Sequence, residues 1–210
     1  MANDYQIRTK KGYDFFEVAS AFQKAIRRCD EKQAMYWAIE LYESNYAKYA
    51  WKRMLIMSCE DVGLGSPFTN QVVWNLYQTY EWLVALKEHS RPELLPFTQA
   101  VLHLAHCHKS RYIDIAVTVY WAQHEREHLP IPDYAYDEHT KVGRMKGRGR
   151  AHFWNEAALI NNPRLVENEE EMRKIAYEVG GEHSKPLKEN ISCTDKEASE
   201  MAQLTLFDEF

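Results

Sequence analysis

Apolar side chains recur at helical spacing through the first part of the chain, up to Pro132. The first run places apolar residues at positions 15, 18, 19, 22, 25 and 26, and Asp14 stands at its start as a cap. A second run is expected to stop near Ser44. A third run ends at the glycine pair Gly63 and Gly65. The pattern therefore predicts three amphipathic helices in this stretch.

Three more helices are predicted from the next runs. Ser66 followed by Pro67 is typical of an N-cap and first helical turn, so a fourth helix should begin there and reach position 86. A fifth is expected to begin at the prolines at 92 and 96, and a sixth is expected from Ser110 to His128, where prolines follow. No stretch shows sustained strand alternation. We therefore predict an all-α fold, a compact helical array with a flexible acidic C-terminal tail.

The character of the chain changes after Pro132. We expect a helical domain at 10–132, a basic segment rich in glycine and arginine with a short helix at 133–160, and an acidic tail at 161–210. The whole chain carries 26 Lys/Arg and 31 Asp/Glu, and the tail alone holds 6 and 12 of them. The net charge of -5 therefore belongs to the tail, and the rest is close to neutral.

Composition narrows the class of protein. An apolar content of 45% supports a real core. The four cysteines lie far apart and form no CxxC pair, which is typical of a reducing compartment. The N-terminus lacks the apolar region of a signal peptide, and no run approaches the roughly 18 apolar residues of a membrane span. We therefore expect a cytoplasmic protein with no membrane partner.

Four sequence segments carry a recognisable pattern when taken together: Tyr13–Phe16 with Ser20–Arg27, Ala34–Trp37, Ser58–Leu64, and Gln99–Ala105 followed by Lys109–Ser110. Their order and spacing are similar to those in the C-terminal helical domain of the RarA/MgsA family, which are clamp-loader-like AAA+ ATPases associated with stalled replication forks. The resemblance covers about residues 10–128 and implies a helical fold, assembly into a tetramer and a role at replication forks.

The resemblance does not extend to an ATPase module. The phosphate-binding pattern G-x-x-x-x-G-K-[ST] does not occur in the sequence, so its lysine and phosphate cradle have no counterpart. The segment after Pro132 also departs from the family's ending. We therefore expect neither an enzyme nor a bound cofactor. An alternative is a detached subunit that pairs with a separately encoded AAA+ ATPase.

A short motif near the C-terminus, Gln203–Phe207, looks like the bacterial sliding-clamp-binding peptide, with the pattern Gln-Leu-x-Leu-Phe. The candidate clamp-binding residues are Gln203, Leu204, Leu206 and Phe207. An extended tail would place Leu206 and Phe207 in an apolar pocket and Gln203 at a smaller, hydrogen-bonding subsite. Because an unstructured tail loses entropy on binding, one peptide should bind weakly, and several copies in an oligomer would add avidity. The alternative is a terminal apolar patch that folds back on the domain.

A basic segment lies between positions 141 and 150, with no acidic residue in it. Glycines allow its backbone to approach a phosphate, and cations neutralise that phosphate, so DNA contact is a hypothesis. The aromatic pair Phe153 and Trp154 could stack on bases. The alternative is a solvated loop, or a loop paired with the acidic tail. The candidate DNA-binding residues are Lys141, Arg144, Lys146, Arg148 and Arg150.

The segment His124–His128 matches the pattern H-E-x-x-H of zinc hydrolases, which needs both histidines one turn apart on a helix with a glutamate between them. A metal-dependent hydrolase built on His124, Glu125 and His128 is therefore an alternative function. We favour a solvated helix end, because the prolines follow at once and no third ligand stands at a familiar spacing. We expect no bound metal.

Two further polar groups are interpreted as structural. His103, His106 and His108 lie in a segment that packs in the resembled family, so core or surface roles are expected rather than a metal site. Glu60 and Asp61 lie at a helix end, where a structural role is more economical than acid–base chemistry.

The sequence as a whole predicts a non-enzymatic accessory protein of DNA replication or repair. Its expected partners are the sliding clamp, further copies of itself in a tetramer, DNA, and an AAA+ ATPase.

Overall fold

The structure is a computed structural model that describes residues 7–161, 171, 172, 174–176 and 178. These residues form helices and turns, and the only bridge among them is an antiparallel one between Arg8 and Asp14. The predicted all-α fold is therefore confirmed. The chain divides into unit 1, Met1–Glu127, and unit 2, His128–Phe210. In the described part of the chain, no helix is both long and apolar enough to cross a membrane.

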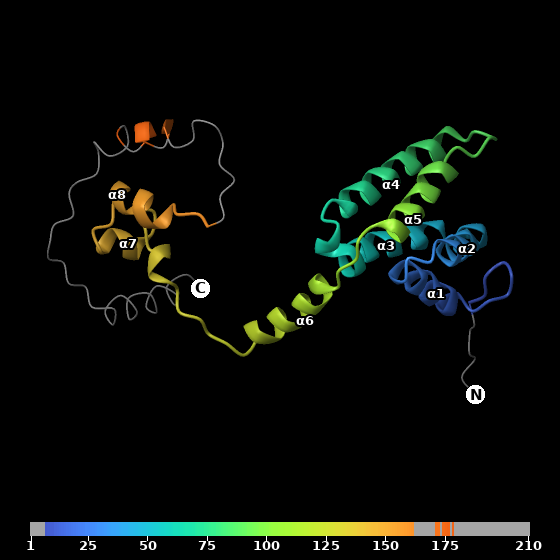
Figure 1. Cartoon of the computed structure of the whole chain (residues 1–210), viewed down its shortest axis with the longest axis horizontal. Helices are drawn as coiled ribbons and strands as arrows, with labels where there is room; N and C mark the ends of the chain where they lie inside the picture. Colours follow the sequence, from blue (N-terminus) through green and yellow to red (C-terminus); the bar gives the residue numbers. More distant parts are fainter. Residues whose placement is uncertain (1–6, 162–170, 173, 177, 179–210) are drawn as a thin grey trace, which may run out of the picture. The chain divides into compact units, whose positions relative to one another are not determined.

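Unit 1 is an array of helices joined by short turns (Figure 1). Helix α1 packs on α2, α4 packs on α5, and α2 and α3 also contact α5. Among the described elements, helix α6 makes most of its contacts with η2 and η3, the two turns that precede α4. The helices are α1 Phe15–Arg27, α2 Glu31–Leu41, α3 Ala47–Met57, α4 Thr69–Leu86, α5 Leu94–His106 and α6 Tyr112–His124, and the turns are η1 Tyr42–Tyr46, η2 Ser58–Val62 and η3 Gly63–Gly65.

Side-chain caps fix the starts of the first two helices. The carboxylate of Asp14 accepts hydrogen bonds from the backbone N–H of Phe16 at 2.8 Å and of Glu17 at 3.1 Å. The carboxylate of Asp30 accepts from Gln33 N–H at 3.0 Å. These bonds satisfy donors that have no partner inside the helix, so the predicted start at Asp14 is confirmed.

The core of unit 1 is centred on Trp51 of α3, whose side chain is 1% exposed. Its ring lies 5.4 Å from Tyr77, 5.3 Å from Tyr80 and 5.6 Å from Phe97, measured between centroids. These neighbours come from α4 and α5, so one indole joins three helices. Aromatic contacts of this geometry add stability beyond the burial of area alone.

Two predicted helix bounds are wrong. Helix α4 begins at Thr69 rather than at Ser66, and its N-cap Phe68 makes no side-chain capping bond. Ser66 instead accepts the backbone N–H of Thr69 through its carbonyl at 3.0 Å, as part of a turn. Helix α6 ends at His124 rather than at His128. Past Trp121 the sequence is charged, so further helical turns would have no apolar face to bury.

Unit 2 holds short helical turns. The Thr140 hydroxyl caps the first turn of α7 by accepting Gly143 N–H at 3.0 Å. A Cβ atom on Gly143 would lie 1.8 Å from the carbonyl oxygen of Asp137, so only glycine permits this close backbone packing. The elements are η4 Asp133–Ala135, α7 Lys141–Met145, α8 Arg150–His152 and η5 Phe153–Ala157.

Replacing Trp51 with alanine should lower the free energy of unfolding of unit 1 by about 3–5 kcal/mol, because the cavity lies where three helices meet. Trp82→Ala is the matched control. Trp82 lies on α4 and is 64% exposed, so its loss should change stability by about 0.5 kcal/mol or less. Urea denaturation followed by circular dichroism would compare the two. Equal effects would show that Trp51 is not the centre of the core.

Candidate functional site

A cluster of charged and amide side chains lies where α1, α3, η2 and the start of α6 meet. At its centre is Asp61 of η2, which is 1% exposed. The guanidinium of Arg27 donates from Nε to Asp61 Oδ1 at 2.5 Å and from Nη2 to Glu60 Oε1 at 2.7 Å. A buried carboxylate is stable only when its lost hydration is replaced by such partners. The arginine of α1 therefore holds η2 in place. We call Gln23, Arg27, Arg53, Glu60, Asp61 and Arg111 the junction cluster.

The remaining members complete the hydrogen bonding of the junction cluster. Gln23 donates from Nε2 to Asp61 Oδ2 at 3.0 Å and to Glu60 Oε2 at 3.2 Å, and its Oε1 accepts from Arg53. Arg111, just before α6, lies 3.8 Å from both carboxylates. Both oxygens of Asp61 thus have donors. This geometry favours the structural interpretation of Glu60 and Asp61 over acid–base chemistry.

The two histidines of α5, His103 and His106, contact different residues. His103 Nε2 lies 3.2 Å from the Thr69 hydroxyl, and burial, together with the charge of Lys109, lowers the pKa of His103. His106 Nε2 lies 2.6 Å from the Glu31 carboxylate on the surface. Within the described residues, no group of three or more His, Cys, Asp or Glu side chains could hold a metal ion.

The H-E-x-x-H segment does not form the helical pair that a zinc hydrolase needs. His124 is the last residue of α6, and Glu125 and His128 lie beyond its end. All three residues are exposed. The two histidines therefore do not sit one turn apart on a helix, and the geometry gives the metal-hydrolase alternative no support.

Two cations of the basic segment are turned inward in unit 2. Asp133 binds Lys146 Nζ at 2.9 Å and also pairs with Arg148. Arg148 donates further to the carbonyl oxygens of Asp133 at 2.6 Å and Tyr136 at 2.8 Å. Their side chains are only 15% and 14% exposed. The hydrogen bonds from Lys146 and then Arg148 hold the pKa of the Asp133 carboxyl below its usual value.

The other three cations are exposed. Arg144 donates to the carbonyl oxygen of His139 at 2.8 Å, and Arg150 lies 3.2 Å from a carboxylate oxygen of Glu138. Lys141 stands in the first turn of α7. The structure thus brings the five candidate residues into one small unit, but part of their charge is compensated locally by Asp133 and Glu138.

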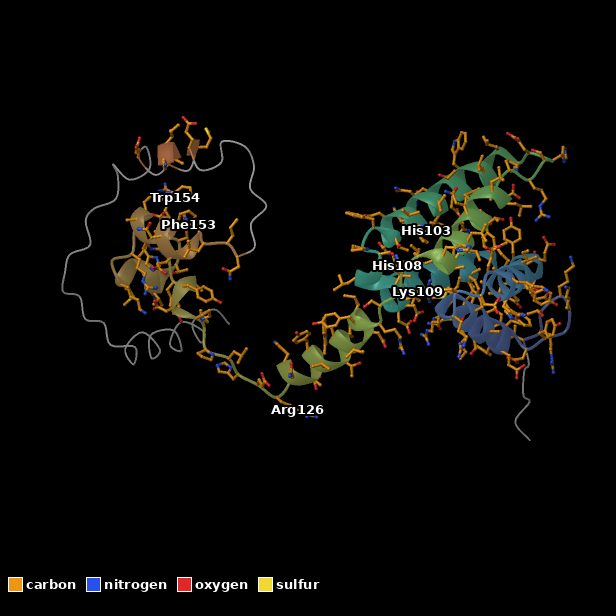
Figure 2. The ribbon with its side chains drawn as sticks, in the orientation of Figure 1. His103, His108, Lys109, Arg126, Phe153 and Trp154 are labelled. Atoms are coloured by element: carbon orange, nitrogen blue, oxygen red, sulfur yellow. The ribbon has the colours of Figure 1, made fainter. Side chains whose placement is uncertain are left out.

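The aromatic pair that follows the basic segment packs inside unit 2 (Figure 2). Phe153 lies edge-on to Trp154 at 5.4 Å and to His139 at 5.6 Å between ring centroids. Both Phe153 and Trp154 are half-buried. Their packing gives these rings a structural role, whereas the sequence suggested stacking on bases.

Sequence reasoning missed several residues that organise these sites. No sequence pattern indicates that Arg27 and Arg111 pair with Asp61, because Asp61 lies far from both of them along the chain. Asp133 could have been found as a carboxylate shortly before a run of cations. The clamp-binding candidates Gln203, Leu204, Leu206 and Phe207 lie outside the described residues.

The fold and the junction cluster define an all-helical domain in which an arginine–carboxylate network joins helices distant in sequence. The chain belongs to the family described as MgsA AAA+ ATPase C terminal, whose family model matches residues 28–180. The resemblance seen in the sequence is therefore confirmed. The match also continues well past Pro132, so the expected departure from the family after that residue is wrong.

Three known proteins are similar in sequence to this chain. The chain is 31% identical over 142 residues to Replication-associated recombination protein A of Bacillus subtilis (strain 168), covering 67% of this chain and 32% of that protein. It is 29% identical over 106 residues to the protein of that name in Coxiella burnetii, covering 50% and 23%. An uncharacterized protein of Thermotoga maritima is 26% identical over 147 residues, covering 68% and 22%. The chain thus spans at most 32% of each of these relatives.

Replacing Arg27 with methionine should lower the free energy of unfolding by about 2–3 kcal/mol, because it leaves the buried Asp61 carboxylate poorly compensated. The loss stays below that of a fully buried pair, since Arg111 remains nearby. Lys24→Met, on an exposed position of the same helix, should cost about 0.5 kcal/mol or less.

Adding Asp61→Asn to Arg27→Met removes the uncompensated charge and should recover part of the loss. Denaturant titration of Arg27→Met, Asp61→Asn and the double variant would measure this coupling. If Arg27→Met proved as mild as Lys24→Met, the junction cluster would not hold unit 1 together.

Proposed function

We propose that this chain is an accessory protein of DNA replication or repair in the cytoplasm, and that it works by binding. Its helical domain self-associates, and its segment Gln203–Phe207 docks on the DNA polymerase sliding clamp. The observation that carries the proposal is the family match over residues 28–180, together with two relatives named as replication-associated recombination proteins. The clamp-like peptide in the same chain points independently to replication.

Binding rather than catalysis is supported by the chemistry of the chain. The 210 residues contain no G-x-x-x-x-G-K-[ST] pattern, which would cradle the phosphates of ATP. The most buried carboxylate of the described part, Asp61, is occupied by arginine and glutamine donors. We therefore propose that the chain is not an enzyme and needs no cofactor or metal.

A second candidate function is a subunit that restores a split machine. The chain matches at most 32% of each relative, and its family model is described as the C-terminal part of an AAA+ ATPase. A separately encoded AAA+ ATPase would then be its partner. Co-purification with such an ATPase at fixed stoichiometry would favour this function over a clamp-tethered scaffold.

DNA contact, where it occurs, belongs to the exposed cations of unit 2. Lys141, Arg144 and Arg150 present charge to solvent, while Lys146 and Arg148 are bound to Asp133. Contacts of this kind neutralise phosphates without reading bases, so they give little sequence preference. We propose that DNA binding is secondary to clamp binding and is limited by the Asp133 pairing.

Clamp binding should disappear when Leu206 and Phe207 are both replaced by alanine, because these side chains would fill the apolar pocket of the clamp. Thr205→Ala is the matched control, since that position is variable in the clamp-binding pattern, and it should bind like the wild type. Calorimetric titration with purified clamp would compare the three chains. Equal binding by the double variant would contradict the proposed docking.

Replacing Asp133 with asparagine should strengthen DNA binding, because it removes a negative charge that lies beside Lys146 and Arg148. The plot of log affinity against log salt should steepen by about 1 for each cation that gains a phosphate. Glu156→Gln removes the same charge from an exposed position of unit 2 and should have little effect. Fluorescence anisotropy over a salt series would measure both. An unchanged slope for Asp133→Asn would show that Lys146 and Arg148 gain no phosphate contacts and that the Asp133 pairing does not limit DNA binding.

A further inference from the structure

Helix α6 carries large apolar side chains around most of its circumference, yet none of its residues is buried. One side carries Tyr112, Ile115 and Val119, and another carries Val117 and Trp121, with exposures from 43% to 70%. Helices that are apolar all round are normally buried. Within unit 1, α6 leads away from the other helices after its first turns (Figure 1). This surface is larger than the scattered apolar residues of an ordinary exposed helix and marks an interaction site.

An apolar groove lies beside the base of α6, with a volume of about 640 Å³. Trp51 and Leu55 of α3 and Tyr77 of α4 line it on one side, and Ile113 and Val117 of α6 on the other. One side of α6 is therefore a wall of the groove, while among the described residues of unit 1 no helix covers the rest of α6.

We infer that α6 and this groove form a self-complementary interface, in which α6 of a second copy lies antiparallel to α6 of the first and covers its groove. The inference rests on the proposed self-association and assigns its surface. A single chain supplies both halves, an uncovered apolar helix and a groove bounded by that same helix. A two-fold pairing then buries both grooves and both helices at once.

Charge complementarity favours a second copy of this chain. Lys48 and Lys52 of α3 stand at the groove, and neither has an ion-pair partner within the described residues. Glu125 and Glu127 are exposed just past the end of α6, and with Arg126 between them this segment carries one net negative charge. Because α6 is roughly 20 Å long, antiparallel pairing brings this acidic end of one copy to the base of α6 in the other, next to α3.

The acidic side chains of the groove itself do not oppose this pairing. Glu60 and Asp114 line the groove, but Arg111 pairs with both of them. Lys48 and Lys52 are thus the charged side chains of the groove that can pair with a second copy.

The exposed apolar surface is also of the right size. Each large aromatic side chain can bury on the order of 150 Å² or more, and a standard interface needs about 800 Å² from each partner. The apolar residues of α6 and the lining of the groove together reach that order.

The first test is the mass of the full chain in multi-angle light scattering without clamp or DNA. The wild type should have at least twice the mass of one chain, and Val117→Glu with Trp121→Glu should reduce it to one chain. Thr118→Glu is the matched control, because Thr118 lies with Asp114 on the polar edge of α6 and should keep the wild-type mass. A wild type that stays monomeric at all concentrations, or a double variant with wild-type mass, would overturn the inference.

The second test shows whether the groove is covered by a second copy or by a segment of the same chain. One chain carries Lys48→Glu and Lys52→Glu, and another carries Glu125→Lys and Glu127→Lys. Each alone should associate roughly tenfold or more weakly, because like charges then face each other. An equimolar mixture should regain association, because every contact between the two variants again joins opposite charges. A cover within one chain predicts no gain on mixing, which would overturn the inference.

The same variants distinguish this inference from the proposed clamp binding. Val117→Glu with Trp121→Glu should still bind the clamp through Gln203–Phe207, with the affinity of a single peptide. Leu206→Ala with Phe207→Ala should keep the wild-type mass. Loss of one property without the other shows which of the two proposals has failed.

Discussion

The ion pair between Arg27 and the buried Asp61 is the constraint on which unit 1 depends. A carboxylate that is 1% exposed is costly unless its hydration is replaced, and here the replacement comes from α1 through Arg27 and Gln23. The backbone carbonyl of Asp61 also accepts the N–H of Ser110 at 3.0 Å. One short turn therefore fixes both the position of α1 and the point where the chain enters α6. The pairing specifies an arrangement of helices that apolar packing alone would define less sharply.

The sequence predicts the helices well because their information is local. Apolar spacing and the cap Asp14 determine α1 within a few residues, and similar reasoning finds the other helices of unit 1. The errors come where local rules compete with the rest of the fold. Ser66 offers a helix cap, but the chain uses its carbonyl in a turn before α4. The prolines after position 128 suggest a helix that reaches His128. Helix α6 ends at His124 instead, because its charged end has no apolar surface to pack against.

The candidate sites are less predictable because their contacts join residues distant in sequence. Arg27 and Asp61 lie in two different segments of the family resemblance, and nothing in either segment shows that they meet. The basic segment shows the opposite problem. Its charges are plain in the sequence, but the pairing of Lys146 and Arg148 with Asp133 depends on how unit 2 folds. A count of charges therefore overestimates the cation surface available to DNA.

Self-association and clamp binding support each other in the proposed function. A short peptide that becomes ordered on binding has a modest affinity, since part of the contact energy offsets lost chain entropy. A second peptide held on the same assembly binds at a high effective concentration, so an oligomer would remain on a multi-subunit clamp far longer than one chain. An exposed apolar α6 would be a liability in a monomer, but it becomes useful when it joins copies. The exposed apolar surface of α6 would thus join the copies, and the joined copies would give the weakly binding peptide its avidity.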